Sequence, residues 1–327
     1  MSAGTLLATA IERAPFDDHD GRSGALLERA VLRDGRRVVV KHVDLAADLV
    51  AIFTGDRVVR EAALWEHGLL DRLPPGVGHT VLDVVREHHT LLVMRDVGAH
   101  VYDWYTPLPT VEVDRIVGAL AAMHRTFVGI DLPWLCDLPT LLGAFAPSRL
   151  IVQPEGLPDV VAMAVAGWEA LADLVPDDLF DALVSTAEAP APLSAALAAG
   201  GTTLLHGDAW PVNVALTSDE VILLDWGLAT AGPGSLDVAL FLWGTSSRMF
   251  PSPDEVLAIY GRSEPALDRD LTLLSLYAAT VIYAWEKAAG LTRAPASIDR
   301  AHLRADLDWW AGRATTALEA GLVPPVG

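Results

Sequence analysis

The chain has 327 residues, of which 52% are hydrophobic and 20% are charged, and its formal net charge at pH 7 is −20. This composition is typical of a globular enzyme with a substantial core and excludes a disordered chain. An acidic surface repels phosphate backbones and anionic lipids, so we expect neither a nucleic acid nor a membrane as a partner.

The first hundred residues are predicted to form a β-rich region that contains one long helix. The spacing of the apolar residues from Leu6 to Ile11 predicts a short helix at the start. Alternating apolar and polar residues then predict two pairs of strands, with an amphipathic helix between the pairs. In chain order these elements are strands over 25–32 and 37–43, a helix over 56–73, and strands over 81–86 and 90–97.

From residue 111 onward the pattern is helical, apart from one interruption. The interruption covers residues 202–224 and contains two short β-rich runs around a polar loop. Helices resume at Ser235, and the longest are predicted over 267–290 and 299–320. We therefore predict an α+β fold with two lobes, a small β-rich lobe over 1–97 and a large helical lobe over 98–327. A hinge near residues 94–98 would place a cleft at the junction.

The polar interruption carries three side chains that suit phosphoryl transfer. Asp208 and Asn213 lie in the loop, and Asp225 follows the apolar run 221–224. Mg²⁺ prefers oxygen ligands, usually one or two carboxylates together with phosphate oxygens, and phosphoryl transfer needs positioning and charge neutralisation. We predict that Asp208 orients an acceptor hydroxyl and takes its proton, while Asn213 and Asp225 hold the metal.

A hydrolase centred on the His-x-Asp pair of His206 and Asp208 is the alternative from the same residues. Such a site needs further histidines nearby, and those at positions 88, 89, 124 and 302 lack metal-site spacing. We therefore interpret His206 as a structural residue that forms a hydrogen bond near the turn at Asp225.

The pattern His206-x-Asp208-x-x-x-x-Asn213, followed by Asp225-Trp226, resembles the catalytic loop and metal-binding segment of the aminoglycoside phosphotransferase family. The resemblance implies the bilobal fold of protein kinases and transfer of the γ-phosphate of ATP or GTP to a small molecule, with Mg²⁺.

Two departures from protein kinases are typical of the small-molecule kinases of this family. Gly207 and Trp226 stand where protein kinases carry Arg and Phe. The segment 229–239 also resembles the family, which implies that Asp237 braces the catalytic loop.

The same resemblance implies a nucleotide site in the first lobe. Lys41, one of only two lysines in the chain, would contact the α- and β-phosphates with Glu61 as its ion-pair partner. A hinge would bind the purine, and a loop that lacks the G-x-G-x-x-G pattern of protein kinases would cover the phosphates. The expected nucleotide-binding residues are Lys41, Glu61, Ser23, Gly24, Met94, Asp96 and Val97.

The acceptor is expected to be a small molecule with a hydroxyl group, bound by the helical lobe. Family resemblance favours an antibiotic (an aminoglycoside, a macrolide or a nucleoside antibiotic), with a metabolite such as a sugar, amino sugar or amino alcohol as the alternative. Aromatic residues at helical spacing are often core residues, but they can also line a pocket. The candidate acceptor residues are Trp210, Trp285, Glu286, Asp306 and Trp310.

A nucleotide-binding pseudokinase without activity is the alternative from another class of function. Retention of Asp208 argues against it, because a binding module has no need of a base.

The sequence also predicts a cytoplasmic location. Residues 1–10 lack the basic segment of a secretory signal, and no apolar run is long enough to span a bilayer. Cys136 is the only cysteine and lies in an apolar stretch, so we expect a buried structural thiol.

Overall fold

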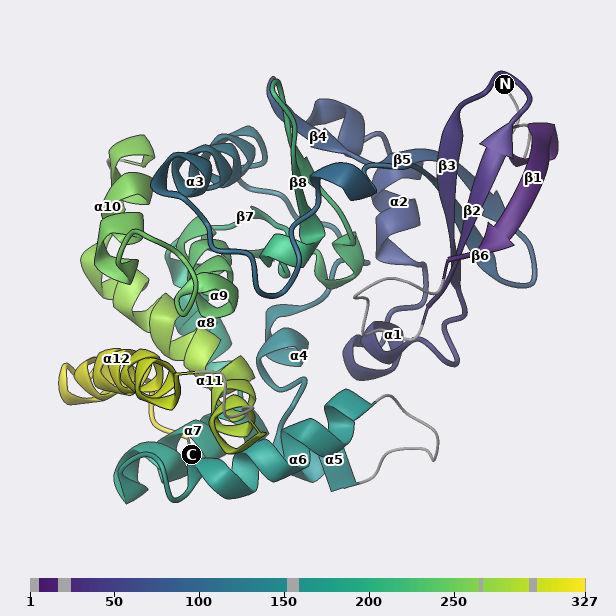
Figure 1. The fold of residues 1–327 in the computed structure, drawn as a ribbon. Helices are drawn as coiled ribbons and strands as arrows, with labels where there is room; N and C mark the ends of the chain where they lie inside the picture. The colour runs from purple at the N-terminus through teal and green to yellow at the C-terminus, as the bar shows by residue number, and fades with distance from the viewer. Residues whose placement is uncertain (1–5, 17–24, 152–158, 265–266, 294–298, 327) are drawn as a thin grey trace.

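The computed structural model describes residues 6–16, 25–151, 159–264, 267–293 and 299–326. A β-sheet lies at one side of the molecule and a helical body at the other (Figure 1). The two share one large hydrophobic core, which runs from the inner face of the sheet into the helices. The α+β architecture expected from the sequence is therefore confirmed.

The main sheet has five antiparallel strands in the order β1-β2-β3-β6-β5. Because side chains alternate across a strand, Val38 and Val40 of β3 pack in a small outer cluster, while Val39, Lys41 and Val43 face inward. The strands are β1 (Ala10–Pro15), β2 (Leu26–Leu32), β3 (Arg37–Val43), β5 (Val81–Arg86) and β6 (Thr90–Arg95).

The predicted strands in the first hundred residues are confirmed, but the predicted helix at the start is wrong. A single 3₁₀ turn, η1 (Leu7–Thr9), precedes β1, whose pairing with β2 leaves no room for a helix.

The long helix predicted over 56–73 is also wrong, because the chain is broken into shorter pieces. The pieces within this range are α2 (Arg60–Glu66) and the 3₁₀ turn η2 (Leu70–Arg72), and a helix that was not predicted, α1 (Leu49–Thr54), precedes them. Gly55 and Gly68 have positive φ angles of 61° and 68°, and these left-handed residues end α1 and α2. Val59 also has a positive φ, 55°, and turns the chain into α2.

Two small sheets surround the polar interruption. Strand β4 (Val77–His79) pairs in parallel with β9 (Val221–Leu223), which also pairs with β8 (Val214–Leu216). Strand β7 (Thr203–Leu205) pairs with β10 (Thr230–Gly232). The strand that leads to Asp225 is therefore hydrogen-bonded on both sides, once to a segment from the first hundred residues.

The helical body is organised around α11 (Arg269–Arg293), which contacts α6, α9 and α12. Nearly all residues of helix α9 are buried and most of them are apolar, as expected for a central helix. The other helices are α3 (Thr110–Thr126), α4 (Leu138–Leu142), α5 (Pro147–Ile151), α6 (Asp159–Leu171), α7 (Asp177–Glu188), α8 (Ala191–Ala199), α9 (Gly234–Thr245), α10 (Pro253–Ser263) and α12 (Arg300–Glu319), with 3₁₀ turns η3 (Gly98–His100), η4 (Pro211–Asn213) and η5 (Trp226–Leu228).

The long helices predicted near the C-terminus are confirmed within a few residues. In the part of the chain that the structure describes, no helix combines the length and apolar character that a membrane span requires.

Candidate active site

The loop after β7 is fixed by a buried carboxylate from α9. Asp237 is fully buried and accepts hydrogen bonds from the backbone N–H groups of His206 and Gly207, each at 2.9 Å. The Nε2 atom of His206 lies 2.9 Å from the carbonyl oxygen of Leu224, directly before Asp225. The structural interpretation of His206 is confirmed, and Asp237 braces the loop as the resemblance implied.

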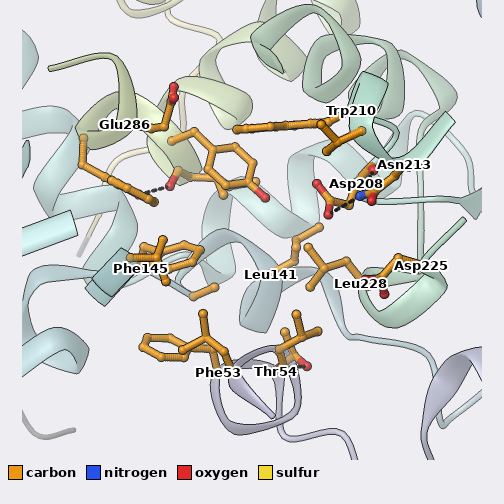
Figure 2. Close-up of a pocket in the computed structure, with 18 of the residues that line it drawn as sticks. Phe53, Thr54, Leu141, Phe145, Asp208, Trp210, Asn213, Asp225, Leu228 and Glu286 are labelled. Carbon is orange, nitrogen blue, oxygen red and sulfur yellow. Dashed lines mark hydrogen bonds between the residues drawn. The ribbon is translucent and has the colours of Figure 1, made fainter. Parts of the chain in front are cut away.

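Asp208 and Asn213 face each other across this loop (Figure 2). The Asn213 Nδ2 atom donates to the Asp208 Oδ2 atom at 2.8 Å and to the Asp208 carbonyl oxygen at 3.0 Å. Burial raises the pKa of Asp208 well above its ordinary value, and the negative charge of Asp225 raises it further. A carboxylate with a raised pKa is a stronger base, which suits the removal of a proton from an alcohol.

Asp225 meets the two residues predicted to bind nucleotide phosphates. The Lys41 Nζ atom lies 2.8 Å from the Asp225 Oδ1 atom and 3.5 Å from the Glu61 Oε2 atom. Burial alone would raise the pKa of Asp225, but the Lys41 ammonium outweighs it and lowers the pKa. Burial raises the pKa of Glu61 to about 6 against the opposing effect of Lys41. Lys41 therefore holds together the buried Glu61 carboxylate and the half-buried Asp225 carboxylate.

A cavity of about 390 Å³ lies between the main sheet and the catalytic loop. This volume lies within the range of small-molecule sites. Its lining includes every described residue predicted to bind nucleotide, namely Lys41, Glu61, Met94, Asp96 and Val97. The remaining two predicted contacts, Ser23 and Gly24, lie outside the described residues.

A second cavity lies on the other side of the catalytic loop, between α1, α4 and α11. Val212, Asn213 and Asp225 line both cavities, whereas Asp208 lines only this second one. The two cavities therefore meet at Asn213 and Asp225. A phosphate group held there from the first cavity would face a hydroxyl held beside Asp208 in the second.

Three of the five candidate acceptor residues line the second cavity, namely Trp210, Trp285 and Glu286. The structure does not bring Asp306 or Trp310 there. The Asp306 Oδ2 atom lies 2.6 Å from the Lys287 Nζ atom in a buried ion pair. Trp310 is fully buried, and its Nε1 atom donates to Ser246.

Sequence reasoning missed Phe53 and Phe145, which also line the second cavity (Figure 2). They come from α1 and from the turn after α4, and no motif marks either position.

The donor atoms present suit Mg²⁺. No cluster of three or more His, Cys, Asp or Glu side chains that could hold a metal occurs among the described residues. Mg²⁺ at phosphoryl-transfer sites takes only one or two carboxylates, and substrate phosphates and water supply the other ligands. Because Asn213 directs its Nδ2 atom at Asp208, its amide oxygen points away from that residue. The Asp225 carboxylate and the Asn213 amide oxygen therefore fit such a metal.

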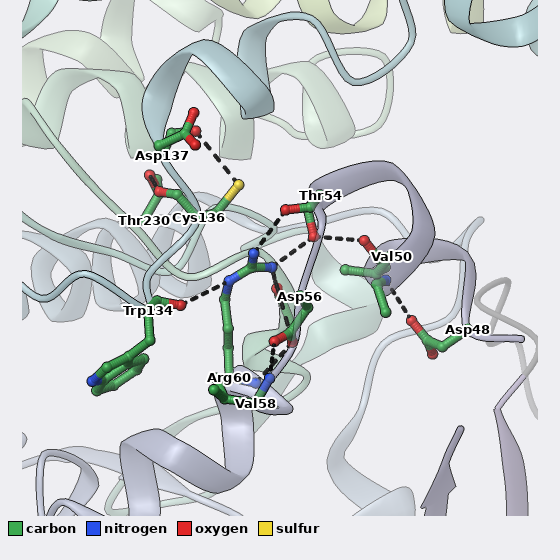
Figure 3. A network of polar contacts seen from close by, with 12 residues as sticks. Asp48, Val50, Thr54, Asp56, Val58, Arg60, Trp134, Cys136, Asp137 and Thr230 are labelled. Carbon is green, nitrogen blue, oxygen red and sulfur yellow. Dashed lines mark hydrogen bonds and ion pairs between the residues drawn. The ribbon is translucent and has the colours of Figure 1, made fainter. Parts of the chain in front are cut away.

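Arg60 joins α2 to the segment after Asp225 (Figure 3). Its guanidinium donates to the carbonyl oxygens of Thr54, Trp134 and Gly227 at 2.9, 3.2 and 3.0 Å, and to the Thr54 hydroxyl at 2.6 Å. Asp56 lies 3.9 Å away. One buried side chain thus ties the end of α1, the start of α2 and the segment after Asp225 together. No sequence motif marks this role.

A family model described as "Phosphotransferase enzyme family" matches residues 24–271. No curated protein matches the sequence significantly. Among solved structures, an aminoglycoside phosphotransferase from Alicyclobacillus acidocaldarius is similar with a TM-score of 0.51 and 16% identity, covering 98% of this chain and 95% of its own.

Two further solved structures are similar at comparable levels. The choline kinase LicA from Streptococcus pneumoniae has a TM-score of 0.53 and 14% identity over 97% of this chain and 94% of its own. An aminoglycoside phosphotransferase from Streptomyces rimosus, solved with ADP and streptomycin, has a TM-score of 0.50 and 18% identity over 81% of this chain and 94% of its own. At such identities these similarities establish the fold.

Proposed function

The chain belongs to the phosphotransferase enzyme family and is a small-molecule phosphotransferase, and we propose that it transfers the γ-phosphate of ATP or GTP, with Mg²⁺, to a hydroxyl group. The observation that carries the proposal is the meeting of two cavities at Asn213 and Asp225, with Asp208 on one side of them and Lys41 on the other. This is the order of groups that in-line phosphoryl transfer needs.

In this proposal the residues up to about 97 supply most contacts to the nucleotide, and those from 98 onward supply most of the acceptor site, to which α1 adds Phe53. Met94, Asp96 and Val97 contact the base, and Lys41 neutralises charge on the phosphates. Glu61 holds Lys41 in place through the 3.5 Å contact. Similar folds solved with ADP or AMP support a nucleotide in the first cavity.

Asp225 and Asn213 would hold Mg²⁺, which would neutralise charge on the β- and γ-phosphates. Asp208 would accept the proton of the acceptor hydroxyl, and its hydrogen bond from Asn213 fixes the direction in which it points. The hydroxyl oxygen forms the new P–O bond, and the bond to the leaving nucleoside diphosphate breaks. Positioning and electrostatic stabilisation would supply most of the rate enhancement.

An antibiotic is the acceptor that we favour, with a metabolic amino alcohol or sugar as the alternative. The similar structures include enzymes named for both kinds of acceptor, aminoglycosides and choline. Inactivation of an antibiotic by phosphorylation would make the protein a resistance enzyme.

The proposed function is tested by Asp208→Ala, with transfer followed by mass spectrometry on a panel of antibiotics, amino sugars and amino alcohols. Loss of the base should lower kcat by about 10²- to 10⁴-fold and leave the Kd for nucleotide within about twofold. Asp219→Ala, in the exposed turn between β8 and β9, is the matched control and should change neither.

Unchanged kcat in Asp208→Ala would contradict the role of this residue. A wild-type protein that binds nucleotide and transfers phosphate to no acceptor would instead be the pseudokinase.

A further inference from the structure

The chemistry of the acceptor can be narrowed from the walls of the second cavity, and this step rests on the proposed function. Six aromatic side chains line it, namely Phe53, Trp104, Phe145, Trp210, Tyr283 and Trp285. Most of the remaining lining is aliphatic and includes Leu141 and Leu228 (Figure 2). Such walls favour apolar surface, because contact with it releases water from both partners.

The aromatic rings form two groups that pack together. Phe145 stacks on Phe53 with ring centroids 5.3 Å apart and lies 4.9 Å from Trp285. Trp210 lies 5.3 Å from Tyr283 and 5.7 Å from Trp104. Rings held in this way present a preformed apolar surface.

Only one carboxylate of this cavity is free of a role in the transfer itself. Its lining contains Asp208, Asp225 and Glu286 and, among the described residues, no Lys, Arg or His. Asn213 engages Asp208 and Lys41 engages Asp225. That leaves Glu286, on the opposite side of the cavity from Asp225 (Figure 2).

The charge of Glu286 is partly offset by its surroundings. Its Oε2 atom accepts a hydrogen bond from Trp243 Nε1 at 3.3 Å. Burial lowers the pKa of the nearby Arg248, while the carboxylates of Asp103 and Glu286 raise it. An ammonium group buried without a partner is strongly unfavourable. An amino sugar with three or more ammonium groups would leave at least two of them without a carboxylate here.

The size of the cavity also favours an acceptor with a small apolar group. Its volume is about 160 Å³, and it opens to solvent on one side. An apolar cavity of about 150 Å³ holds one benzene molecule. The space beside Asp208 therefore suits one ring-sized or branched apolar group.

From these observations we propose that the acceptor is an alcohol with an apolar, ring-sized group next to its hydroxyl and no more than one amine. The apolar group lies against the wall formed by Phe53, Phe145 and Trp285, the hydroxyl lies at Asp208, and a single amine, where present, lies at Glu286. Polycationic amino sugars are excluded from this class.

The test is an acceptor panel of matched pairs, read by mass spectrometry and initial rates with Mg²⁺ and ATP or GTP. One member is an apolar alcohol, either a substituted cyclohexanol or a phenyl-substituted alcohol. Its partner presents the same hydroxyl on a body with three amines. We expect kcat/KM to be at least about tenfold higher for the apolar member.

Equal or better phosphorylation of the triamine members overturns the inference and leaves the proposed function standing. Failure to phosphorylate any apolar alcohol, in a protein that binds Mg²⁺ and nucleotide, also overturns it. Absence of nucleotide binding contradicts the proposed function itself, so the two failures are distinguishable.

Phe145→Ser tests the apolar wall directly. Phe180→Ser is the matched control, because Phe180 is also half-buried in the helical body but packs against Trp168 outside the cavity. Phe145→Ser should raise KM for the best apolar alcohol at least about tenfold and leave KM for the nucleotide unchanged. Phe180→Ser should change neither KM, and an unchanged acceptor KM in Phe145→Ser contradicts the assignment of this wall.

Glu286→Gln tests the site for a single amine. It should lower kcat/KM for a monoamine alcohol about tenfold and leave the neutral analogue unchanged. An equal effect on both compounds contradicts the placement of the amine.

Discussion

Gly207 occupies the point where the catalytic loop passes closest to the metal-binding segment. Its φ is 79°, and a Cβ atom there would lie 2.3 Å from the carbonyl oxygen of Leu228. The backbone conformation and the close approach therefore both require glycine. The position that carries Arg in protein kinases admits no side chain in this chain.

We predict that Gly207→Ala lowers both stability and activity. The left-handed conformation costs alanine about 1–2 kcal/mol, and the clash with Leu228 adds to this cost and displaces Asp208. The free energy of unfolding from urea titration and kcat should both fall, kcat by more than about tenfold.

Gly35→Ala is the control for this substitution, because Gly35 has a φ of 85° in a hairpin turn where an added Cβ atom would meet nothing within 4 Å. Gly35→Ala should lose only the stability that the left-handed conformation costs alanine, and it should keep full kcat. Equal losses of unfolding free energy and of kcat in Gly207→Ala and Gly35→Ala would show that the close approach of Gly207 to Leu228 contributes to neither.

At the scale of residues, the sequence predicted the site where its members are close along the chain. Asp208 and Asn213 are five residues apart, and their contact is set by one loop. Phe53 and Phe145 reach the same cavity from elements 92 residues apart (145 − 53), so no local pattern announces them. Trp310 shows the reverse case, a residue of suitable type that packing places in the core.

Helices α1 and α2 are short, so their position depends on what holds them. Arg60 supplies hydrogen bonds from α2 to Thr54, Trp134 and Gly227, and it is almost fully buried (Figure 3). Since Glu61 follows it in the same helix, the side chain that fixes α2 also fixes the partner of Lys41.

We predict that Arg60→Lys destabilises the protein by about 3 kcal/mol, because one ammonium cannot replace the forked guanidinium and buried acceptors lose their partners. Thermal or urea unfolding measures this loss. Arg304→Lys, in an exposed i,i+4 pair with Asp308, is the control and should cost less than about 0.5 kcal/mol. A loss of unfolding free energy in Arg60→Lys no larger than that in Arg304→Lys would contradict the role of Arg60 in holding α1, α2 and Gly227 together.

At the scale of elements, the strands were predictable and the helix breaks were not. Strand β3 alternates between two buried faces and carries a dense β-branched pattern. The short extent of α2 depends on Gly68 and on Val59, a valine with a left-handed conformation that sequence patterns do not favour. Tertiary contacts, those of Arg60 above all, stabilise it.

The whole molecule carries a formal charge of −20, and a nucleotide adds further negative charge. The cavity that would receive it is lined by four acidic residues, Glu61, Asp96, Asp103 and Asp225, and by Lys41 and Arg95, of which Arg95 is paired with Glu220. Binding of a polyphosphate there needs compensating positive charge, which Lys41 and Mg²⁺ would supply. Nucleotide binding should therefore depend on both the metal and this lysine.

The two lysines of the chain offer a matched pair for testing that dependence. Lys41 and Lys287 each form an ion pair with a buried carboxylate, that of Glu61 and that of Asp306, so Lys41→Met and Lys287→Met should each destabilise the free protein, by about 3–5 kcal/mol where that carboxylate loses its partner. Only Lys41 lines the nucleotide cavity. In the wild type, ADP with Mg²⁺ at 100 times its Kd should add about 2.7 kcal/mol of stability.

Lys287→Met should keep this increment in a thermal unfolding assay, whereas Lys41→Met at the same nucleotide concentration should lose most of it. Chelation of Mg²⁺ with EDTA should remove most of the increment from the wild type, because the phosphates would then face Asp225 without the metal. A full increment in Lys41→Met, or in wild type with EDTA, would show that the charge of the nucleotide is neutralised elsewhere. Loss of the increment in Lys287→Met would instead place the nucleotide near α11 and α12.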